Sequence, residues 1–203
     1  MSTLVGNSAP IFKADAVMAD GSFRQINLED FRGKYVLLLF YPLDFTFLSP
    51  AELIAFSDRN DDFAALSVQI LGASVDSKFS HQAWRNMSRQ DGGLGELAFP
   101  LIADLNKSIA RGYEVLYDES VSHRALFLID RQGIVRHQVV NDLPLARSAD
   151  EALRMVQALQ HFEENGELCP DDWPEGCRAV KPGVAESKNF DTAEYTAKLL
   201  GIL

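Results

Sequence analysis

The stretch that decides the fold is YVLLLFYPLDFTFLSPAELIAF, residues 35–56. Its first part, Tyr35–Tyr41, is a continuous apolar run that ends at Pro42, a pattern typical of a central strand covered on both faces. The peptide SPAE at 49–52 resembles a helix start, with a capping Ser, Pro at the first helical position and Glu three residues after the cap. Apolar residues recur along a helical face to Leu66 and lead to a second predicted strand, Gln69–Val75. The stretch therefore predicts a βαβ unit.

Turn residues and apolar patterns on both sides of this unit predict the other elements. They are a small N-terminal hairpin around 19–22, a helix from about Ser77 to Gln90, a glycine loop at 91–95, a short helix from about Asn106, an antiparallel strand pair at 125–130 and 134–140, and a last helix from a second capping pattern at Ser148 to about Asn165. The antiparallel pair makes the predicted sheet mixed. We expect an α/β domain with a central mixed sheet flanked by helices.

The chain after the last helix has a different character. It contains Pro170, Pro174 and Pro182 and shows no strong periodicity before a short helix-like run at its end. We therefore expect a domain over residues 1–165 and a C-terminal arm over 166–203. Its apolar residues have little of their own to pack on, which favours docking on the same domain or on a partner subunit; they are Trp173, Phe190, Tyr195 and Leu199.

The composition excludes several classes of protein. The 203 residues are 47% hydrophobic and 24% charged, which suits a folded core, and the net charge of −10 argues against a nucleic-acid partner. The longest apolar run is far short of the roughly 20 residues that span a bilayer. The N-terminus has no basic leader followed by an apolar segment. We expect a cytoplasmic protein without membrane contact.

The cysteines and histidines do not form a ligand pattern. Cys169 and Cys177 are the only cysteines and stand eight positions apart, which fits neither a disulfide framework nor a zinc site. The four histidines are scattered and are interpreted as surface or packed residues; they are His81, His123, His137 and His161. No metal or cofactor is predicted, and Cys177 is interpreted as incidental.

The start of the helix at position 49 suits a reactive anion. Backbone N–H groups without helical partners and the positive end of the helix dipole both favour negative charge there. A cysteine at such a position, with a guanidinium beside it, would have a lowered thiol pKa and would supply a thiolate. A serine hydroxyl is a weak nucleophile unless a general base lies next to it. No G-x-S-x-G motif or His/Asp pair marks Ser49 as the nucleophile of a serine hydrolase.

The chain resembles a typical two-cysteine peroxiredoxin, of the alkyl hydroperoxide reductase or thioredoxin peroxidase type. The resemblance rests on FYPLDFTFLSPAE at 40–52, GGLG at 92–95, RALFLID at 124–130, NDLP at 141–144 and GELCP at 166–170. It implies a thioredoxin-like fold, and it places Ser49 where the family has the peroxide-attacking cysteine. Leu48 and Ala51 also depart from the family's FVCPTE pattern.

The resemblance also assigns roles to the surrounding residues. Pro42 would shield the pocket, Thr46 would hydrogen-bond peroxide and nucleophile, and Arg124 would stabilise the anion. Glu52 would orient Arg124 together with Arg147. Cys169 matches the resolving cysteine, which in the family reaches across a dimer to condense with the sulfenic acid.

Partners and assembly follow from the same resemblance. It implies hydrogen peroxide and small organic hydroperoxides as substrates, and thioredoxin or a dedicated flavoprotein reductase as electron donor. It implies a homodimer that assembles into a ring of five dimers. The family pairs its GGLG loop with a C-terminal Tyr-Phe that slows disulfide formation; here Asn189-Phe190 stands near that place, so sensitivity to over-oxidation is left open.

Ser49 changes what this chain can do. Oxygen cannot pass through the sulfenic acid on which the cycle depends, so we expect peroxidase turnover to be absent or nearly absent. The serine can still cap its helix. Two explanations compete: an engineered Cys→Ser change that mimics the reduced form, and a natural loss. The alternative function is a non-enzymatic paralogue that acts as a ring scaffold, chaperone or redox-signalling partner.

Overall fold

The computed structural model describes residues 3–170, 179 and 181. The chain divides into two compact units, Met1–Ala149 and Asp150–Leu203, and each is described by itself. The domain limits expected from the sequence, 1–165 and 166–203, stay a prediction.

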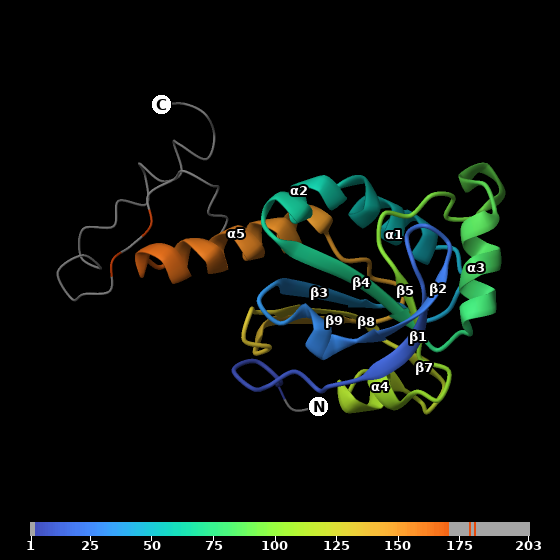
Figure 1. The fold of residues 1–203 in the computed structure, drawn as a ribbon, viewed down its shortest axis with the longest axis horizontal. Coiled ribbons are helices and arrows are strands. Elements are labelled where there is room, and N and C mark those ends of the chain that lie inside the picture. The colour runs from blue at the N-terminus through green and yellow to red at the C-terminus, as the bar shows by residue number, and fades with distance from the viewer. Residues whose placement is uncertain (1–2, 171–178, 180, 182–203) are drawn as a thin grey trace. The chain divides into compact units, whose positions relative to one another are not determined.

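The first unit is built on a mixed seven-stranded sheet (Figure 1). The strand order is β2-β1-β5-β4-β3-β8-β9. The strands are β1 Lys13–Val17, β2 Phe23–Asn27, β3 Tyr35–Phe40, β4 Val68–Ser74, β5 Leu101–Ala103, β8 Arg124–Ile129 and β9 Val135–Asn141; a separate pair is formed by β6 Leu116–Tyr117 and β7 Val121–Ser122. β3 pairs parallel with β4 and antiparallel with β8, which confirms the predicted mixed sheet.

The predicted βαβ unit and both predicted hairpins are confirmed. All six residues of β3 are buried, as expected for a strand covered on both faces. β1 and β2 pair in an antiparallel hairpin from Lys13↔Asn27 to Val17↔Phe23, and β8 pairs with β9 from Arg124↔Asn141 onward. The end of β3 lies beside the start of β8, and the candidate site forms there.

The helix predicted to run from Ser49 to Leu66 is two helices. α1 runs over Ser49–Asp58 with Arg59 as its C-cap, and α2, Asn60–Ala65, follows. Arg59 leaves helical geometry, with φ −103° and ψ 8°, and its Nε donates to Asp62 at 2.6 Å. The polar peptide SDRNDD at 57–62 supplies no apolar side chain that would continue one face across the junction, so the periodicity alone overestimated the helix.

The helix predicted from Ser77 to Gln90 also ends early. α3 runs over Lys78–Asn86, and a single 3-10 turn, η2, follows at Arg89–Asp91. Ser88 caps that turn by accepting from the amide of Asp91. Three shorter elements complete the unit: η1 Leu28–Phe31, η2 and α4 Ser108–Gly112, the last of which matches the short helix expected from about Asn106.

α5 runs over Ala149–Asn165, as the sequence predicts, and the second unit contains it from Asp150 onward. Gly166 follows it, and its amide donates to the Phe162 carbonyl at 2.8 Å. Cys177 and the four apolar arm residues named above lie outside the described residues, as does Asn189-Phe190. No helix in the described part of the chain is long and apolar enough to cross a membrane.

Candidate active site

The loop between β3 and α1 carries the position that the sequence singles out. Pro42 is buried directly after β3, and Phe45 takes a positive φ of 55°, which a residue with a side chain rarely adopts. α1 then starts at Ser49, with Leu48 as its N-cap. The loop thus delivers Ser49 to the first position of a helix at the end of the central strand.

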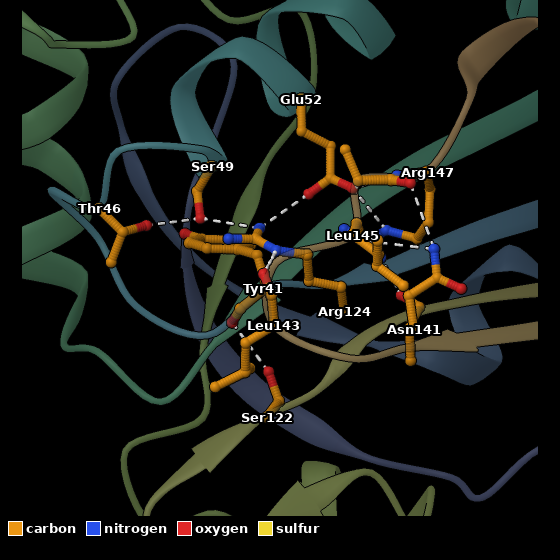
Figure 2. A network of polar contacts seen from close by, with 12 residues as sticks. Tyr41, Thr46, Ser49, Glu52, Ser122, Arg124, Asn141, Leu143, Leu145 and Arg147 are labelled. Atoms are coloured by element: carbon orange, nitrogen blue, oxygen red, sulfur yellow. Dashed lines mark hydrogen bonds and ion pairs between the residues drawn. The ribbon is translucent and has the colours of Figure 1, made fainter.

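Ser49 does not cap the helix, which corrects the expectation from the SPAE pattern. The N-cap residue makes no side-chain hydrogen bond, and Ser49 lies inside the first turn. Its side chain is engaged elsewhere: Thr46 Oγ1 lies 2.6 Å from Ser49 Oγ, and Arg124 Nη1 donates to the same oxygen at 3.1 Å (Figure 2). The fully buried Ser49 hydroxyl is therefore an acceptor in a polar site.

Arg124 comes from the strand beside β3. The register Phe40↔Ala125 places the start of β8 next to the end of β3, so Arg124 reaches the first turn of α1. Its Nη1 also contacts Glu52 Oε2 at 3.1 Å, and its Nε donates to the Leu143 carbonyl at 2.6 Å. The side chain is 4% exposed, so its charge acts in a largely dry environment.

Glu52 joins Arg124 to Arg147, as the resemblance implies. Both the backbone N–H and Nε of Arg147 donate to Glu52 Oε1, at 2.7 and 2.8 Å, and Arg147 Nη1 donates to the Ala125 carbonyl. Figure 2 shows the carboxylate between the two guanidinium groups. One carboxylate faces two arginines, so the cluster retains a positive charge beside Ser49.

The charge state of Glu52 follows from these partners. Burial by itself raises the pKa of this carboxyl, but the hydrogen bonds and charge of Arg147, with the charge of Arg124, outweigh it and hold the pKa below its ordinary value of 4.5. Glu52 is therefore an anion at neutral pH. It can orient both arginines without taking a proton from them.

Sequence reasoning missed the residue that shapes the loop carrying Arg147. Asn141 Nδ2 donates to the carbonyls of Leu145 and Ala146, at 3.3 and 3.2 Å, and so closes the turn before Arg147. The peptide NDLP was noted as a motif, and its Asn is where β9 ends. A short polar side chain at the end of a strand is a general signal for such a turn.

A second missed feature is a buried polar network below the loop. Tyr41, Asp44 and His81 contact one another: the Tyr41 hydroxyl donates to Asp44 Oδ1 at 2.9 Å, and His81 Nδ1 lies 2.8 Å from Asp44 Oδ2. His81 is fully buried, so its interpretation as a packed residue holds. Helical spacing offered a signal, since His81 shares a face with the buried Trp84 and Arg85.

Cys169 lies in the second unit. Its thiol is partly buried and contacts the Ala158 carbonyl, with a sulfur–oxygen distance of 3.7 Å. Burial raises the pKa of this thiol; Arg154 opposes that shift and Glu167 adds to it. A thiol of raised pKa is protonated at neutral pH and is not itself the activated nucleophile.

The described residues contain no group of three or more His, Cys, Asp or Glu side chains that could hold a metal ion. The groups that surround Ser49 in the described structure are a helix terminus, the Thr46 hydroxyl and the Arg124 guanidinium. Of the seven site residues expected from the sequence, all but Cys169 lie in the first unit. Thr46 and Arg124 contact Ser49, and Glu52 contacts both Arg124 and Arg147.

Fold and site together define an α/β protein that holds a nucleophile position beside two buried arginines at a helix N-terminus. Residues 5–138 match the AhpC/TSA family. Peroxiredoxin-2 of Mus musculus is 54% identical over 187 residues, 92% of this chain and 94% of that protein. The reduced 2-Cys peroxiredoxin of Plasmodium vivax is 47% identical, with a TM-score of 0.90 over 97% of this chain and 100% of that one.

A third similar structure is described as Plasmodium yoelii Prx1a, modified at the N-terminus, in an artifactual octamer. It is 51% identical, with a TM-score of 0.76 over 84% of this chain and 99% of that one. The chain belongs to the AhpC/TSA family, as a typical two-cysteine peroxiredoxin, and this family consists of thiol peroxidases. The expected thioredoxin-like fold is thereby confirmed.

Proposed function

We propose that this chain has the site of a thiol peroxidase for hydrogen peroxide and small organic hydroperoxides, with Ser49 in the place of the peroxide-attacking cysteine. The observation that carries the proposal is the contact of Ser49 Oγ with both Thr46 Oγ1 and Arg124 Nη1 at the first turn of α1. Sulfur at that place would receive the same two donors. Both would stabilise a thiolate and the charge that develops during attack.

The chemistry of a thiolate at position 49 can be written in full. The sulfur attacks one oxygen of ROOH, the O–O bond breaks, and the departing RO⁻ takes a proton, which gives a sulfenic acid and ROH. The Cys169 thiol then condenses with the sulfenic acid, and water leaves as the disulfide forms. A dithiol protein, thioredoxin or a dedicated reductase, returns two electrons.

The Thr46 hydroxyl can hydrogen-bond to position 49 whether that position holds a neutral hydroxyl or a thiolate. Its hydroxyl oxygen lies 3.0 Å from the Leu43 carbonyl and 2.6 Å from Ser49 Oγ, but the hydroxyl has only one hydrogen to donate. Beside a neutral hydroxyl, it can donate to Leu43 and accept from Ser49. Beside a thiolate, or a peroxide oxygen, it can turn and donate toward position 49.

The serine itself cannot complete this cycle. In the described part of the chain, the groups that hydrogen-bond its side chain are a hydroxyl and a guanidinium, neither of which is a general base at neutral pH. We therefore expect the chain as it stands to be inactive or nearly so. The non-enzymatic scaffold is the alternative, and the intact Glu52–Arg124–Arg147 cluster counts against it because a scaffold has no need of an anion site.

Ring assembly is also proposed, and two surfaces support it. β9 stands at an edge of the sheet with a strand neighbour on one side, which suits pairing with a second copy. Near the opposite edge, the Phe23 and Phe79 rings form an exposed pair at 5.6 Å, 40% and 65% exposed. Homodimers that join into a ring of five would cover both surfaces. The cytoplasmic location stays a prediction.

The role of Cys169 is tested by cross-linking. The Ser49→Cys protein, treated with one equivalent of hydrogen peroxide, should run as a disulfide-linked dimer on a non-reducing gel. The matched control, Ser49→Cys/Cys169→Ser, should stay monomeric and should collect sulfenic acid, detectable by its mass. A dimer that persists without Cys169 would assign the resolving role to Cys177.

The origin of Ser49 is tested separately by the codon at that position in the source gene. A cysteine codon would show a laboratory substitution that preserves the reduced form. A serine codon would show a natural loss.

A further inference from the structure

The chain turns back along α5 directly after that helix ends. Gly166 follows the helix in the left-handed region, at φ 67°, which favours a residue without a side chain. Beyond it, the Glu167 carboxylate lies beside the His161 ring, and the Cys169 thiol lies beside the Ala158 carbonyl. Residues three apart share a face of a helix, so both contacts fall on the same side of α5.

His161 joins the two sides of this turn through both of its ring nitrogens. Nε2 lies 3.0 Å from Glu167 Oε2, an oxygen that only accepts, so Nε2 carries a hydrogen. Nδ1 lies 3.3 Å from the side-chain nitrogen of Asn165, which donates, so Nδ1 is an acceptor. One hydrogen on the ring is therefore enough for both partners. Because the ring is 26% exposed and the carboxylate 24%, solvent screens their contact and keeps it modest in strength.

The position against α5 keeps the Cys169 thiol unreactive. The sulfur is partly buried and lies 3.7 Å from the Ala158 carbonyl oxygen, to which it donates. Burial is the main cause of the raised pKa of this thiol; Arg154 has a smaller effect that lowers the pKa, and Glu167 one that raises it. A thiol that leaves α5 loses this burial, becomes accessible and ionises more readily. The thiolate is the form that attacks, so release from the helix precedes reaction.

The contacts that hold the turn differ in kind. The Gly166 amide donates to the Phe162 carbonyl at 2.8 Å, a backbone bond that substitution of a side chain leaves in place. The contact of Cys169 with Ala158 is a weak sulfur hydrogen bond and involves the reacting group itself. The bond from His161 to the Glu167 carboxylate is charge-assisted, and it can be removed without any change to the sulfur.

We propose that His161 is a positioning residue that holds the Cys169 segment against α5 through Glu167 and so sets how often the thiol is released for disulfide formation. The inference rests on the proposed function for its kinetic consequence. In that cycle the Cys169 sulfur bonds to the sulfenic acid at position 49, and water leaves. Loss of the His161 contact favours the released segment, so it speeds this step and leaves the attack on peroxide unchanged.

The Ser49 chain tests the inference without peroxidase activity. With Cys177→Ser as the background, Cys169 is the only thiol, and its rate of alkylation by iodoacetamide measures how often the sulfur is released. His161→Leu removes both ring nitrogens, whereas His161→Gln keeps one donor for Glu167 and one acceptor. We expect alkylation to be about twofold to fivefold faster in His161→Leu, as for the loss of one partly exposed contact, and close to the parent rate in His161→Gln.

A matched control carries the same new side chain one turn further along the helix. Glu164→Leu changes an exposed residue of α5 and should leave the alkylation rate unchanged. Circular dichroism and the melting temperature of each variant show that the fold is kept. Equal alkylation rates in His161→Leu and the parent would overturn the proposal, and so would an equal acceleration in His161→Leu and His161→Gln.

The Ser49→Cys protein, again with Cys177→Ser, tests the kinetic consequence. After one equivalent of hydrogen peroxide, samples quenched at successive times and analysed by intact mass separate sulfenic acid formation from disulfide formation. In His161→Leu, the first rate should stay unchanged and the second should rise about twofold to fivefold. A disulfide rate that does not follow the alkylation rate would contradict the proposal. If no sulfenic acid formed, the proposed function would fail, and alkylation of the Ser49 chain would decide this inference alone.

Discussion

Glu52 shows how one residue sets the charge of the site. Its carboxylate is buried between Arg124 and Arg147, at 3.1 and 2.8 Å. Replacing it with a neutral amide leaves two buried guanidinium groups without the negative charge that compensates them. We expect Glu52→Gln to lower the free energy of unfolding by about 3–5 kcal/mol at neutral pH.

The pH dependence of that loss follows from the direction of the pKa shift. The folded state holds the pKa of Glu52 below 4.5, so the stabilisation is fully present above 4.5 and is lost as the pH falls through the folded-state pKa. The gap in melting temperature between the unsubstituted chain and Glu52→Gln should therefore narrow in acid. A gap that stayed constant from neutral pH to well below 4.5 would contradict the assigned charge.

Tyr113 provides a second test at the scale of one residue. Its ring packs on Phe40 and Phe127, but within the described part of the structure its buried hydroxyl has no hydrogen-bond partner. Burial raises its pKa above the usual value. We expect Tyr113→Phe to leave stability unchanged or to raise it by up to about 1 kcal/mol in urea denaturation.

The matched control is the other buried tyrosine. Tyr41 donates to Asp44, so Tyr41→Phe removes a hydrogen bond to a charged group and should cost about 1–3 kcal/mol. Equal effects of the two substitutions would show that the hydroxyl partners do not matter.

Among the elements, the GGLG loop is more constrained than its composition suggests. The amides of Gly93, Leu94 and Gly95 donate to carbonyls of Ser88, Trp84 and Met87, and the Trp84 indole donates to the Gly92 carbonyl at 3.0 Å. The loop is thus bonded to the end of α3 and to the turn after it. The sequence predicted a glycine loop but not these bonds, because their acceptors are backbone carbonyls, which residue types do not reveal.

Substitution of two neighbouring glycines in this loop should lower the free energy of unfolding by different amounts. A Cβ on Gly93 would lie 2.2 Å from the Met87 carbonyl oxygen, whereas a Cβ on Gly92 meets no atom within 4 Å and faces only the penalty of φ 84°. Gly92→Ala should therefore cost about 1 kcal/mol, and Gly93→Ala clearly more, because backbone must move. Chemical denaturation of both variants checks the order, and the reverse order would contradict the packing.

The sequence predicted an element correctly where its local residue pattern agrees with its tertiary contacts. The apolar run of β3 and the turns of both hairpins specify their structures locally. α1 and α2 were merged because a helical period does not show a cap made by backbone geometry. The SPAE pattern misled for a different reason: Thr46 and Arg124 bind the Ser49 side chain, and the second of these contacts joins residues 75 positions apart.

At the scale of the whole molecule, the site needs segments that only the fold brings together. Ser49 and Glu52 come from α1, Arg124 from β8, and Arg147 from the loop after β9. Resemblance to the family placed these residues in one site, whereas spacing alone could not. The roles of His81 and Asn141 could not be predicted, because their hydrogen-bond partners are backbone carbonyls or lie far away in the sequence.

The exposed pair Phe23 and Phe79 provides a test of the proposed assembly. Phe79 is 65% exposed and packs edge-on against Phe23, with Lys78 Nζ 5.7 Å from the Phe79 ring centre. We expect Phe79→Glu to break the proposed ring into dimers, because a charge would have to be buried between copies. Light scattering after size exclusion measures this. Ile11→Glu, at a site 59% exposed, should leave the mass unchanged.

One atom at position 49 is expected to separate this chain from an active peroxidase. The most direct measurement is the rate of hydrogen peroxide consumption by the Ser49→Cys protein beside the unsubstituted chain, with the same dithiol reductant. We predict rapid consumption by the variant and none above background by the Ser49 chain. An inert Ser49→Cys protein, folded and with its thiol intact, would contradict the peroxidase function and favour the scaffold function.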